Sequence, residues 1–326
     1  MQSMFKYIFA LIVGALFLMF FVGLAYNYAG GEQKLEATLL AKNFDDQLSI
    51  LTVSQDAVQS YEFGVESSLS FNNGVIRSGS GLKTKSENIV FSPLKLQGTK
   101  LVIWARRWSF PFNVGTFFFL SNANYKHVVV YDSTSEEFAK AIMEEEIPKE
   151  FRAVMFNAAQ LKQEFAQVRQ SYSGFEKAKF IYLSSNPNEA LVKAMQRVEN
   201  FDVVVASPGK KGWDYGRLDF QAGQSFFLGK EMLFGAMFAE DYSNYAFNMG
   251  ERILPRLRQI TGIYIGKAGF MLAALPQCSE YSLMATALEK FRSLTAEDSA
   301  EKFASQASAL EDLNDDYFGA ECPGVF

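Results

Sequence analysis

The chain has 326 residues and a mass of 36.6 kDa, about two domains' worth of sequence. Apolar residues make up 49% and charged residues 21%, so the chain can bury a large core and is not expected to be disordered. The net charge of −5 argues against nucleic acid as a partner. One His and two Cys cannot build a four-ligand His/Cys zinc site, a haem-attachment motif or an iron–sulfur cluster, so we predict no cofactor and no metal site.

Residues 1–31 are predicted to form an N-terminal transmembrane anchor. No charge interrupts the chain between Lys6 and Glu32, and residues 7–25 read YIFALIVGALFLMFFVGLA. A helix over this stretch is about 29 Å long, which matches a hydrocarbon core of about 30 Å. A cleaved signal peptide would have a shorter apolar run and a small-x-small cleavage site, and residues 27–29 have Asn where a small residue is needed. The expected partner of residues 7–25 is therefore the lipid bilayer.

The short basic head predicts the orientation of this anchor in the cell membrane. The head carries the α-amine and Lys6 and leads directly into the apolar run, as in a single-pass signal anchor, so we expect the large domain to be extracytoplasmic. Lys34 and Lys42 lie on the far side, so the numbers of basic residues near the two ends are similar. Residues 5–13, FKYIFALIV, resemble the start of uncharacterised single-pass membrane proteins of small-genome archaea. The resemblance implies a source and no function.

Residues 32–87 are predicted to form a juxtamembrane helix followed by a β-hairpin. Asn73 and Gly74 separate two short stretches of strand-forming residues, which is typical of a tight hairpin turn. The helix would continue the anchor or pack on the domain, because apolar residues recur at helical spacing at Leu40, Phe44, Leu48 and Leu51.

Residues 88–275 are predicted to form an α/β domain. The runs HVVVY and DVVVA, at residues 127–131 and 202–206, are continuously apolar, as expected of strands covered on both faces. Repeated strand–helix alternation between them predicts a mostly parallel, Rossmann-like or flavodoxin-like sheet with right-handed crossovers. Additional strands are expected at residues 88–91, 100–106, 116–120, 216–220 and 232–238.

The last part of the chain is predicted to be helical. Residues 242–260 show helical spacing with a kink at Pro255, and residues 262–275 are expected to be a buried core element. Residues 276–326 have the pattern of a C-terminal helical hairpin.

The two cysteines are expected to form a disulfide. Cys278 precedes the first helix of the hairpin and Cys322 follows the second, so antiparallel packing of the helices would bring them together. Such a bond requires an oxidising compartment, which agrees with an extracytoplasmic domain. The alternative is two separate thiols.

The candidate ligand site lies where the parallel strands end, because open parallel sheets bind ligands beyond the carboxyl ends of their strands. The residues there offer a carboxylate, hydroxyls and a basic glycine loop, which suit an anionic or sugar-like ligand. The alternative is that they serve as helix caps and solvated turns. The candidate ligand-binding residues are Asp132, Ser133, Ser184, Ser185, Ser207, Gly209, Lys210 and Lys211.

The sequence contains none of the enzyme motifs that it could be tested for. It has no G-x-x-x-x-G-K-[ST], no G-x-G-x-x-G following a strand and no G-x-S-x-G. His127, the single histidine, begins its strand and so lies at the edge opposite the strand-end loops, which predicts a structural role. We therefore predict no catalytic residues. The sequence leaves undecided whether two of its acidic residues meet to form a catalytic pair of carboxylates.

A compact aromatic–basic cluster is the candidate interaction surface. Alternation along a strand places Trp104, Arg106 and Trp108 on one face. If exposed, this cluster would make a binding hot spot; the alternative is a strand with a packed face.

Two functions compete on this sequence. The first is a membrane-anchored, extracytoplasmic α/β domain that binds or scaffolds a protein partner at the cell surface and catalyses no reaction. The second is an anchored enzyme or small-ligand receptor, in which Asp132 serves as acid or base and Lys210 and Lys211 hold an anion.

Overall fold

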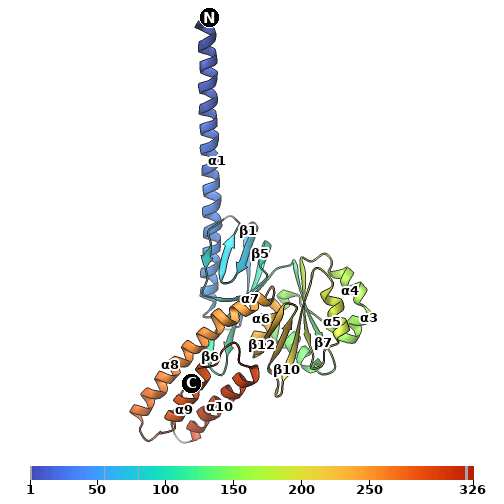
Figure 1. The fold of residues 1–326 in the computed structure, drawn as a ribbon, viewed down its shortest axis with the longest axis vertical. Helices are drawn as coiled ribbons and strands as arrows, with labels where there is room; N and C mark the ends of the chain where they lie inside the picture. The colour runs from blue at the N-terminus through green and yellow to red at the C-terminus, as the bar shows by residue number, and fades with distance from the viewer. Residues whose placement is uncertain (1, 55, 80, 320–321) are drawn as a thin grey trace.

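The structure is a computed structural model that describes the backbone of residues 2–54, 56–79, 81–319 and 322–326. The side chains described are those of residues 15–23, 34–54, 56–79, 81–316 and 322–326. The longest element is α1 (Gln2–Leu51), a continuous helix that projects from the globular part (Figure 1). Among the side chains described, no helix combines the length and apolar character that a membrane span needs. The predicted anchor lies largely outside the described side chains, so it stays a prediction.

The C-terminal half of α1 belongs to the globular core. Ala41, Phe44 and Leu48 are fully buried on one face of the helix. The ring of Phe44 lies 5.3 Å from that of Tyr61 and 5.8 Å from that of Phe71, both edge-on. The helix predicted at the start of residues 32–87 is therefore present as the end of α1, and its position beside a membrane stays a prediction. Because the helix is continuous, the packed end fixes the direction in which the projecting end leaves the domain.

Sheet A packs against this end of α1. Its strand order is β3-β2-β1-β5-β6-β4. The predicted hairpin joins β1 and β2, and Asn73 and Gly74 both have positive φ at its turn (47° and 72°). Because β1 pairs with β5, the predicted boundary after residue 87 cuts through this sheet. The strands are β1 (Ala57–Asn72), β2 (Val75–Ser78), β3 (Thr84–Lys85), β4 (Ile89–Phe91), β5 (Lys95–Ser109) and β6 (Asn113–Ser121).

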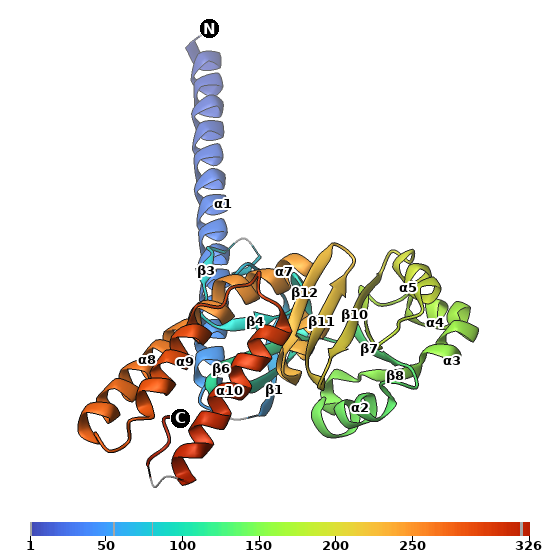
Figure 2. The same cartoon turned by 60° about the horizontal axis from the view of Figure 1, so that its bottom comes forward.

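Sheet B contains the predicted strand–helix alternation. Its strand order is β12-β11-β10-β9-β7-β8, in which β8, β7, β9 and β10 are parallel and β11 and β12 are antiparallel additions. Helices α3, α4 and α5 cover its outer face (Figure 2). The strands are β7 (Tyr125–Tyr131), β8 (Val154–Asn157), β9 (Lys177–Leu183), β10 (Phe201–Gly209), β11 (Gly212–Phe220) and β12 (Gly223–Leu228). The helices are α2 (Glu136–Ala141), α3 (Ala158–Gln163), α4 (Phe165–Tyr172) and α5 (Glu189–Gln196).

Helix α6 (Lys230–Phe238) lies between the two sheets. All of its residues from Met232 to Phe238 are buried, against Trp104 and Phe119 of sheet A and the inner face of sheet B. The prediction of a strand at residues 232–238 is wrong. A helix covered on every side has no polar face, so the helical period is missing from its sequence.

The C-terminal region forms a layer of helices beside the sheets. Helices α7 (Tyr242–Phe247) and α8 (Leu254–Ala274) are joined by a π-helical turn at Asn248–Ile253, and Pro255 begins α8. Helices α9 (Tyr281–Arg292) and α10 (Ala300–Gly319) form the predicted hairpin, which is confirmed.

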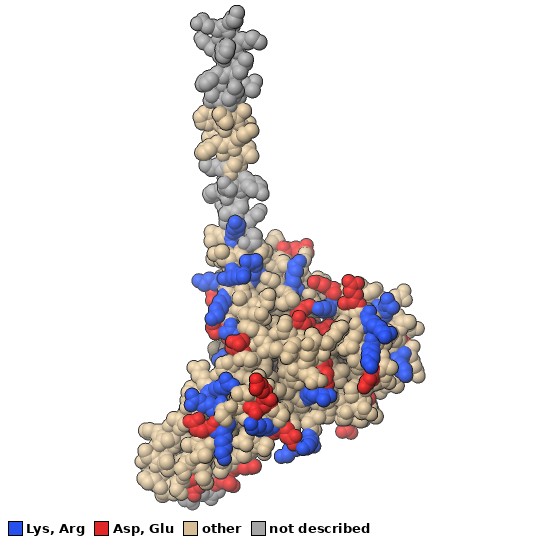
Figure 3. All heavy atoms as spheres, in the orientation of Figure 1, with Lys and Arg blue, Asp and Glu red and all other residues tan. Residues whose placement is uncertain are grey.

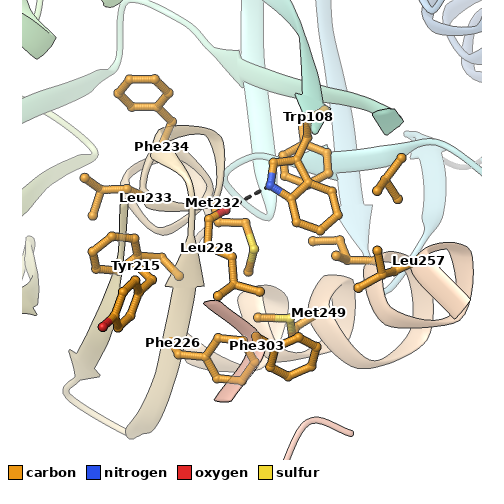
Figure 4. Close-up of a cluster of buried hydrophobic side chains, with 14 of the residues drawn as sticks. Trp108, Tyr215, Phe226, Leu228, Met232, Leu233, Phe234, Met249, Leu257 and Phe303 are labelled. Carbon is orange, nitrogen blue, oxygen red and sulfur yellow. Dashed lines mark hydrogen bonds between the residues drawn. The ribbon is translucent and has the colours of Figure 1, made fainter. Parts of the chain in front are cut away.

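The core between sheet A, α6 and these helices is strongly aromatic (Figure 4). Trp108 is fully buried there, and its indole N–H donates a hydrogen bond to the carbonyl of Leu228 at 2.9 Å. Met232, Leu257 and Phe303 complete the same cluster, although they come from three different helices. The core therefore unites the sheets with the C-terminal helices.

Candidate functional sites

Four predicted ligand-site residues lie near one another where β7 and β9 end. The Asp132 carboxylate accepts hydrogen bonds from the backbone N–H and hydroxyl of Thr134, at 2.8 and 2.6 Å, and from the Ser184 hydroxyl. The Ser185 N–H donates to the Thr134 hydroxyl at 3.3 Å, and Ser133 follows Asp132 in the same loop. Burial raises the pKa of Asp132, but these hydrogen bonds outweigh it and hold the pKa below its usual value. The carboxylate is therefore ionised, and the hydrogen bonds that it accepts stabilise the loop in which it lies.

The other predicted ligand residues lie elsewhere. Strand β10 pairs with β9 only as far as Ala206 and then continues to Gly209, so Lys210 and Lys211 sit at a hairpin tip beyond the sheet edge. Lys210 Nζ lies 2.8 Å from Glu301 of α10. Ser207 is paired with β11 inside this extension. The hairpin therefore belongs to the contact with α10.

The predicted ligand-binding residues line separate cavities. One of about 510 Å³ is lined by Ser133, Thr134 and Trp213. Another of about 750 Å³ lies between the β10–β11 hairpin and α10, and it is lined by Lys210 and Lys211. The larger cavity also contains four acidic side chains, so its charge does not favour an anion. They are Asp214, Glu301, Glu311 and Asp312.

The predicted interaction cluster is not a surface. Trp104 is 2% exposed and Trp108 is 0% exposed, because α6 and the C-terminal helices cover that face of β5. The prediction that Trp104, Arg106 and Trp108 bind a partner is therefore wrong, and the packed-face alternative is right.

Arg106 instead connects the layers of the molecule. Its guanidinium pairs with Glu146, which follows α2, and with Glu231 of α6 at 3.0 Å. It also lies over the rings of Trp104 and Phe234, 5.5 Å from each centroid. Burial lowers the pKa of Arg106, but the carboxylates of Glu146, Glu231 and the more exposed Asp56 outweigh this and raise it. The side chains of Arg106, Glu146 and Glu231 are 16–17% exposed, so their pairing is mostly shielded from solvent.

The remaining predicted residues have structural roles. Cys278 and Cys322 form the predicted disulfide, with their Cα atoms 6.2 Å apart. His127 is 2% exposed, and its Nε2 lies 2.8 Å from the Ser121 hydroxyl. Among the residues that the structure describes, no cluster of His, Cys, Asp and Glu has the form of a metal site.

Helix α8 carries an exposed apolar face that was not predicted from the sequence. Residues 262–275 were expected to be buried, but Ile263 is 61% exposed and Phe270 is 73% exposed. Gly266 and Gly269 lie between them, and a Cβ at either glycine would meet no atom within 4 Å. We call Ile263, Gly266, Gly269 and Phe270 the α8 face.

Few charged residues border the α8 face: Lys267 lies within the same stretch of helix, and the Arg292 guanidinium of α9 lies 3.7 Å from where a Cβ at Gly262 would be. Lys267 is the single charged residue between Arg258 and Glu280, and it turns its ammonium to the backbone carbonyl of Val325 at 2.7 Å. Figure 3 shows the tip of this lobe, at the end of the molecule away from the projecting helix, without charged atoms on the side in view, while acidic side chains lie along its lower edge. The sequence did contain a signal for this exposed face. Ile263 and Phe270 are seven positions apart, which places them on the same side of a helix, and glycines lie between them.

No protein-family model, curated protein or solved structure matches the chain. The resemblance of residues 5–13 to archaeal membrane proteins gains no support from these comparisons and stays a prediction.

Proposed function

We propose that this protein is a membrane-anchored, extracytoplasmic binding and scaffolding module that assembles through the α8 face. The observation that carries the proposal is the exposure of Ile263 and Phe270 on α8, since large apolar side chains exposed on one surface mark interaction sites. The continuous α1 supports the anchor, because the apolar residues 7–25 belong to the same helix that packs on sheet A. The Cys278–Cys322 disulfide supports an oxidising compartment.

The partner that we propose is a second copy of this chain. On the α8 face the side chains of Ile263 and Phe270 project, and the glycines at 266 and 269 leave space between them. In two copies related by a two-fold axis, the projecting side chains of each copy can therefore pack over the glycines of the other. None of the four residues of the face carries a charge. The face is small, but anchoring both copies in one membrane raises their effective concentration and so favours pairing.

We further propose that sheet B is a flavodoxin-like, and in the wider sense Rossmann-like, unit. Numbered along the chain, its four parallel strands lie in the order second, first, third, fourth. This is the order of the first four strands of flavodoxin-like sheets, whose ligands bind between the first and third strands.

The alternative function is a small-ligand receptor or enzyme at that position. It is favoured by the meeting of Asp132 and Ser184 at the ends of β7 and β9. It has less support because the Asp132 carboxylate is already hydrogen-bonded within its loop, and because Lys210 and Lys211 line a different cavity.

Cysteine cross-linking in native membranes tests the proposed assembly. Both natural cysteines are in the disulfide, so Phe270→Cys introduces the single free thiol. We expect mild oxidation to give a covalent dimer of the full-length protein, and an added Ile263→Asp to abolish it. Val65→Cys is the matched control, since Val65 is also 73% exposed but lies on β1. Failure of Phe270→Cys to form a dimer, or equal dimers from Val65→Cys, would contradict assembly through the α8 face.

A further inference from the structure

A cavity lies where the two sheets meet, at the edge of sheet B from which β7 starts. Its volume is about 440 Å³, within the usual range for small-ligand pockets. Sheet A contributes Ser60 of β1 and Lys100 of β5, and sheet B contributes Lys126 near the start of β7. Asp132 follows the other end of β7, so this cavity is separate from the strand-end loops. We call it the inter-sheet cavity.

The buried side chains that line the inter-sheet cavity offer mainly apolar contact. Val102 of β5 and Phe151 are both buried there. The Tyr125 hydroxyl is already hydrogen-bonded to a backbone carbonyl at 2.8 Å. The side chains of Ser121 and Asn122 also have hydrogen-bond partners within the protein. These polar groups are satisfied without a ligand, so the buried wall suits the uncharged part of a bound molecule.

The charged residues that line the inter-sheet cavity are mostly basic. They are Lys100, Lys126, Arg152 and Glu150, so three cations face one carboxylate. Lys100 pairs with Glu62 at 3.5 Å, and both side chains are more than half exposed. Among the residues that the structure describes, no acidic side chain forms an ion pair with Lys126 or Arg152. Two of the three cations are therefore not neutralised by the protein.

These two unpaired cations are held close together. The Lys126 ammonium donates a hydrogen bond to the Arg152 carbonyl at 2.6 Å. Burial lowers the pKa of Lys126, and the charge of Arg152 lowers it further. The backbone of Arg152 is left-handed, with φ of 49°, which is unfavourable for a residue that has a Cβ. The protein thus keeps two like charges together at the mouth of a cavity, and a bound anion would remove their repulsion.

We propose that the inter-sheet cavity binds a small organic phosphate, with the phosphate between Lys126 and Arg152 and the rest of the ligand against Val102 and Phe151. A guanidinium matches a phosphate through two parallel hydrogen bonds, and a lysine adds a second charge. A phosphate monoester carries a charge of about −1.5 to −2 at neutral pH, which matches two unpaired cations better than the single charge of a carboxylate. This inference depends neither on the membrane anchor nor on assembly through the α8 face.

Isothermal titration calorimetry of the full-length protein in an uncharged detergent tests this site, with phenyl phosphate as the probe. The probe combines a phosphate with an aromatic ring for the apolar wall. Benzoate has the same ring with a single charge, and phenol has the ring without a charge at neutral pH. We expect phenyl phosphate to bind about tenfold more tightly than benzoate, because one more charge-assisted hydrogen bond is formed, and phenol not to bind.

The variant Arg152→Gly separates binding from folding. Glycine adopts the left-handed conformation without strain, so the variant is expected to fold at least as well as the wild type while it lacks the guanidinium. We expect its affinity for phenyl phosphate to fall about tenfold, and Lys126→Met to have a similar effect. Lys149→Ala is the matched control, since Lys149 is exposed three residues from Arg152 but does not line the cavity.

The control variant is expected to bind phenyl phosphate as the wild type does. Absence of phenyl phosphate binding, equally tight binding of phenol, or an unchanged affinity in Arg152→Gly would overturn the inference. A loss in Lys149→Ala as large as that in Arg152→Gly would also overturn it, because the attraction would then come from surface charge in general.

Discussion

Acidification from pH 7 to pH 5 is expected to destabilise the fold through His127. The imidazole is buried between sheet A and sheet B, with its ring 4.4 Å from that of Phe238. Burial lowers the pKa of His127 to about 3. The folded protein therefore keeps this ring neutral at a pH where an exposed histidine is protonated.

The sign and size of the effect follow from linkage. In the unfolded chain the pKa of a histidine is about 6.5. Below that pH the histidine is protonated in the unfolded state and stays neutral in the folded state. Stability is fully present above about pH 6.5 and is lost progressively down to the folded pKa of about 3. Between pH 7 and pH 5 the loss is about 2 kcal/mol, out of a total stability of about 5–15 kcal/mol.

Guanidinium unfolding of the detergent-solubilised protein at the two pH values measures this loss. The matched variant is His127→Gln, which keeps a partner for the Ser121 hydroxyl and cannot be protonated. Other titrating groups act equally in both proteins, so the wild type is expected to lose about 2 kcal/mol more than the variant. The chain has one histidine, so its imidazole proton resonance is unambiguous. An imidazole that titrates near pH 6.5 in the folded protein, or equal losses in the two proteins, would refute the reasoning.

Two further perturbations test the interior. Arg106→Leu leaves Glu231 without a cation, whereas Glu146 keeps Lys230 at 2.8 Å, so we expect a loss of about 3 kcal/mol in the free energy of unfolding, partly restored by adding Glu231→Gln. No loss in a denaturant titration would show that the ion pairs are solvated. Reduction of the Cys278–Cys322 bond, which closes a separation of 44 residues, is expected to cost about 4 kcal/mol and to lower the Tm. An unchanged Tm after verified reduction would contradict this.

The parallel strands of sheet B were predictable because their apolar runs consist mainly of valine, a β-branched residue that favours strands. HVVVY and DVVVA are covered on both faces, and they appear in the structure as β7 and β10. The apolar run at residues 232–238 looks similar, yet it forms α6. A helix is recognised in a sequence by polar residues that recur at helical spacing, and a completely buried helix has none. The helical conformation of residues 232–238 therefore depends on tertiary packing and could not be predicted from their pattern.

The site residues show where pattern reasoning stops. Alternation correctly placed Trp104, Arg106 and Trp108 on one face of a strand, but it contained no information on what covers that face. Lys210 was assigned to the same edge as Asp132, whereas β10 extends beyond β9 and carries Lys210 to α10. The cysteine pair was predictable because a helical hairpin constrains its own two ends.

If residues 7–25 anchor the chain as proposed, the uninterrupted course of α1 couples rotation of the anchor to the direction in which the distal lobe faces. Each residue of an α-helix turns the chain by about 100° and advances it by about 1.5 Å. One alanine inserted between the uncharged run and Ala37 would therefore swing the globular part a quarter turn around the helix axis while barely changing its height. Neighbouring copies would then present their α8 faces in new directions. The number of residues between the anchor and the globular part therefore determines whether the α8 faces of two anchored copies can face each other.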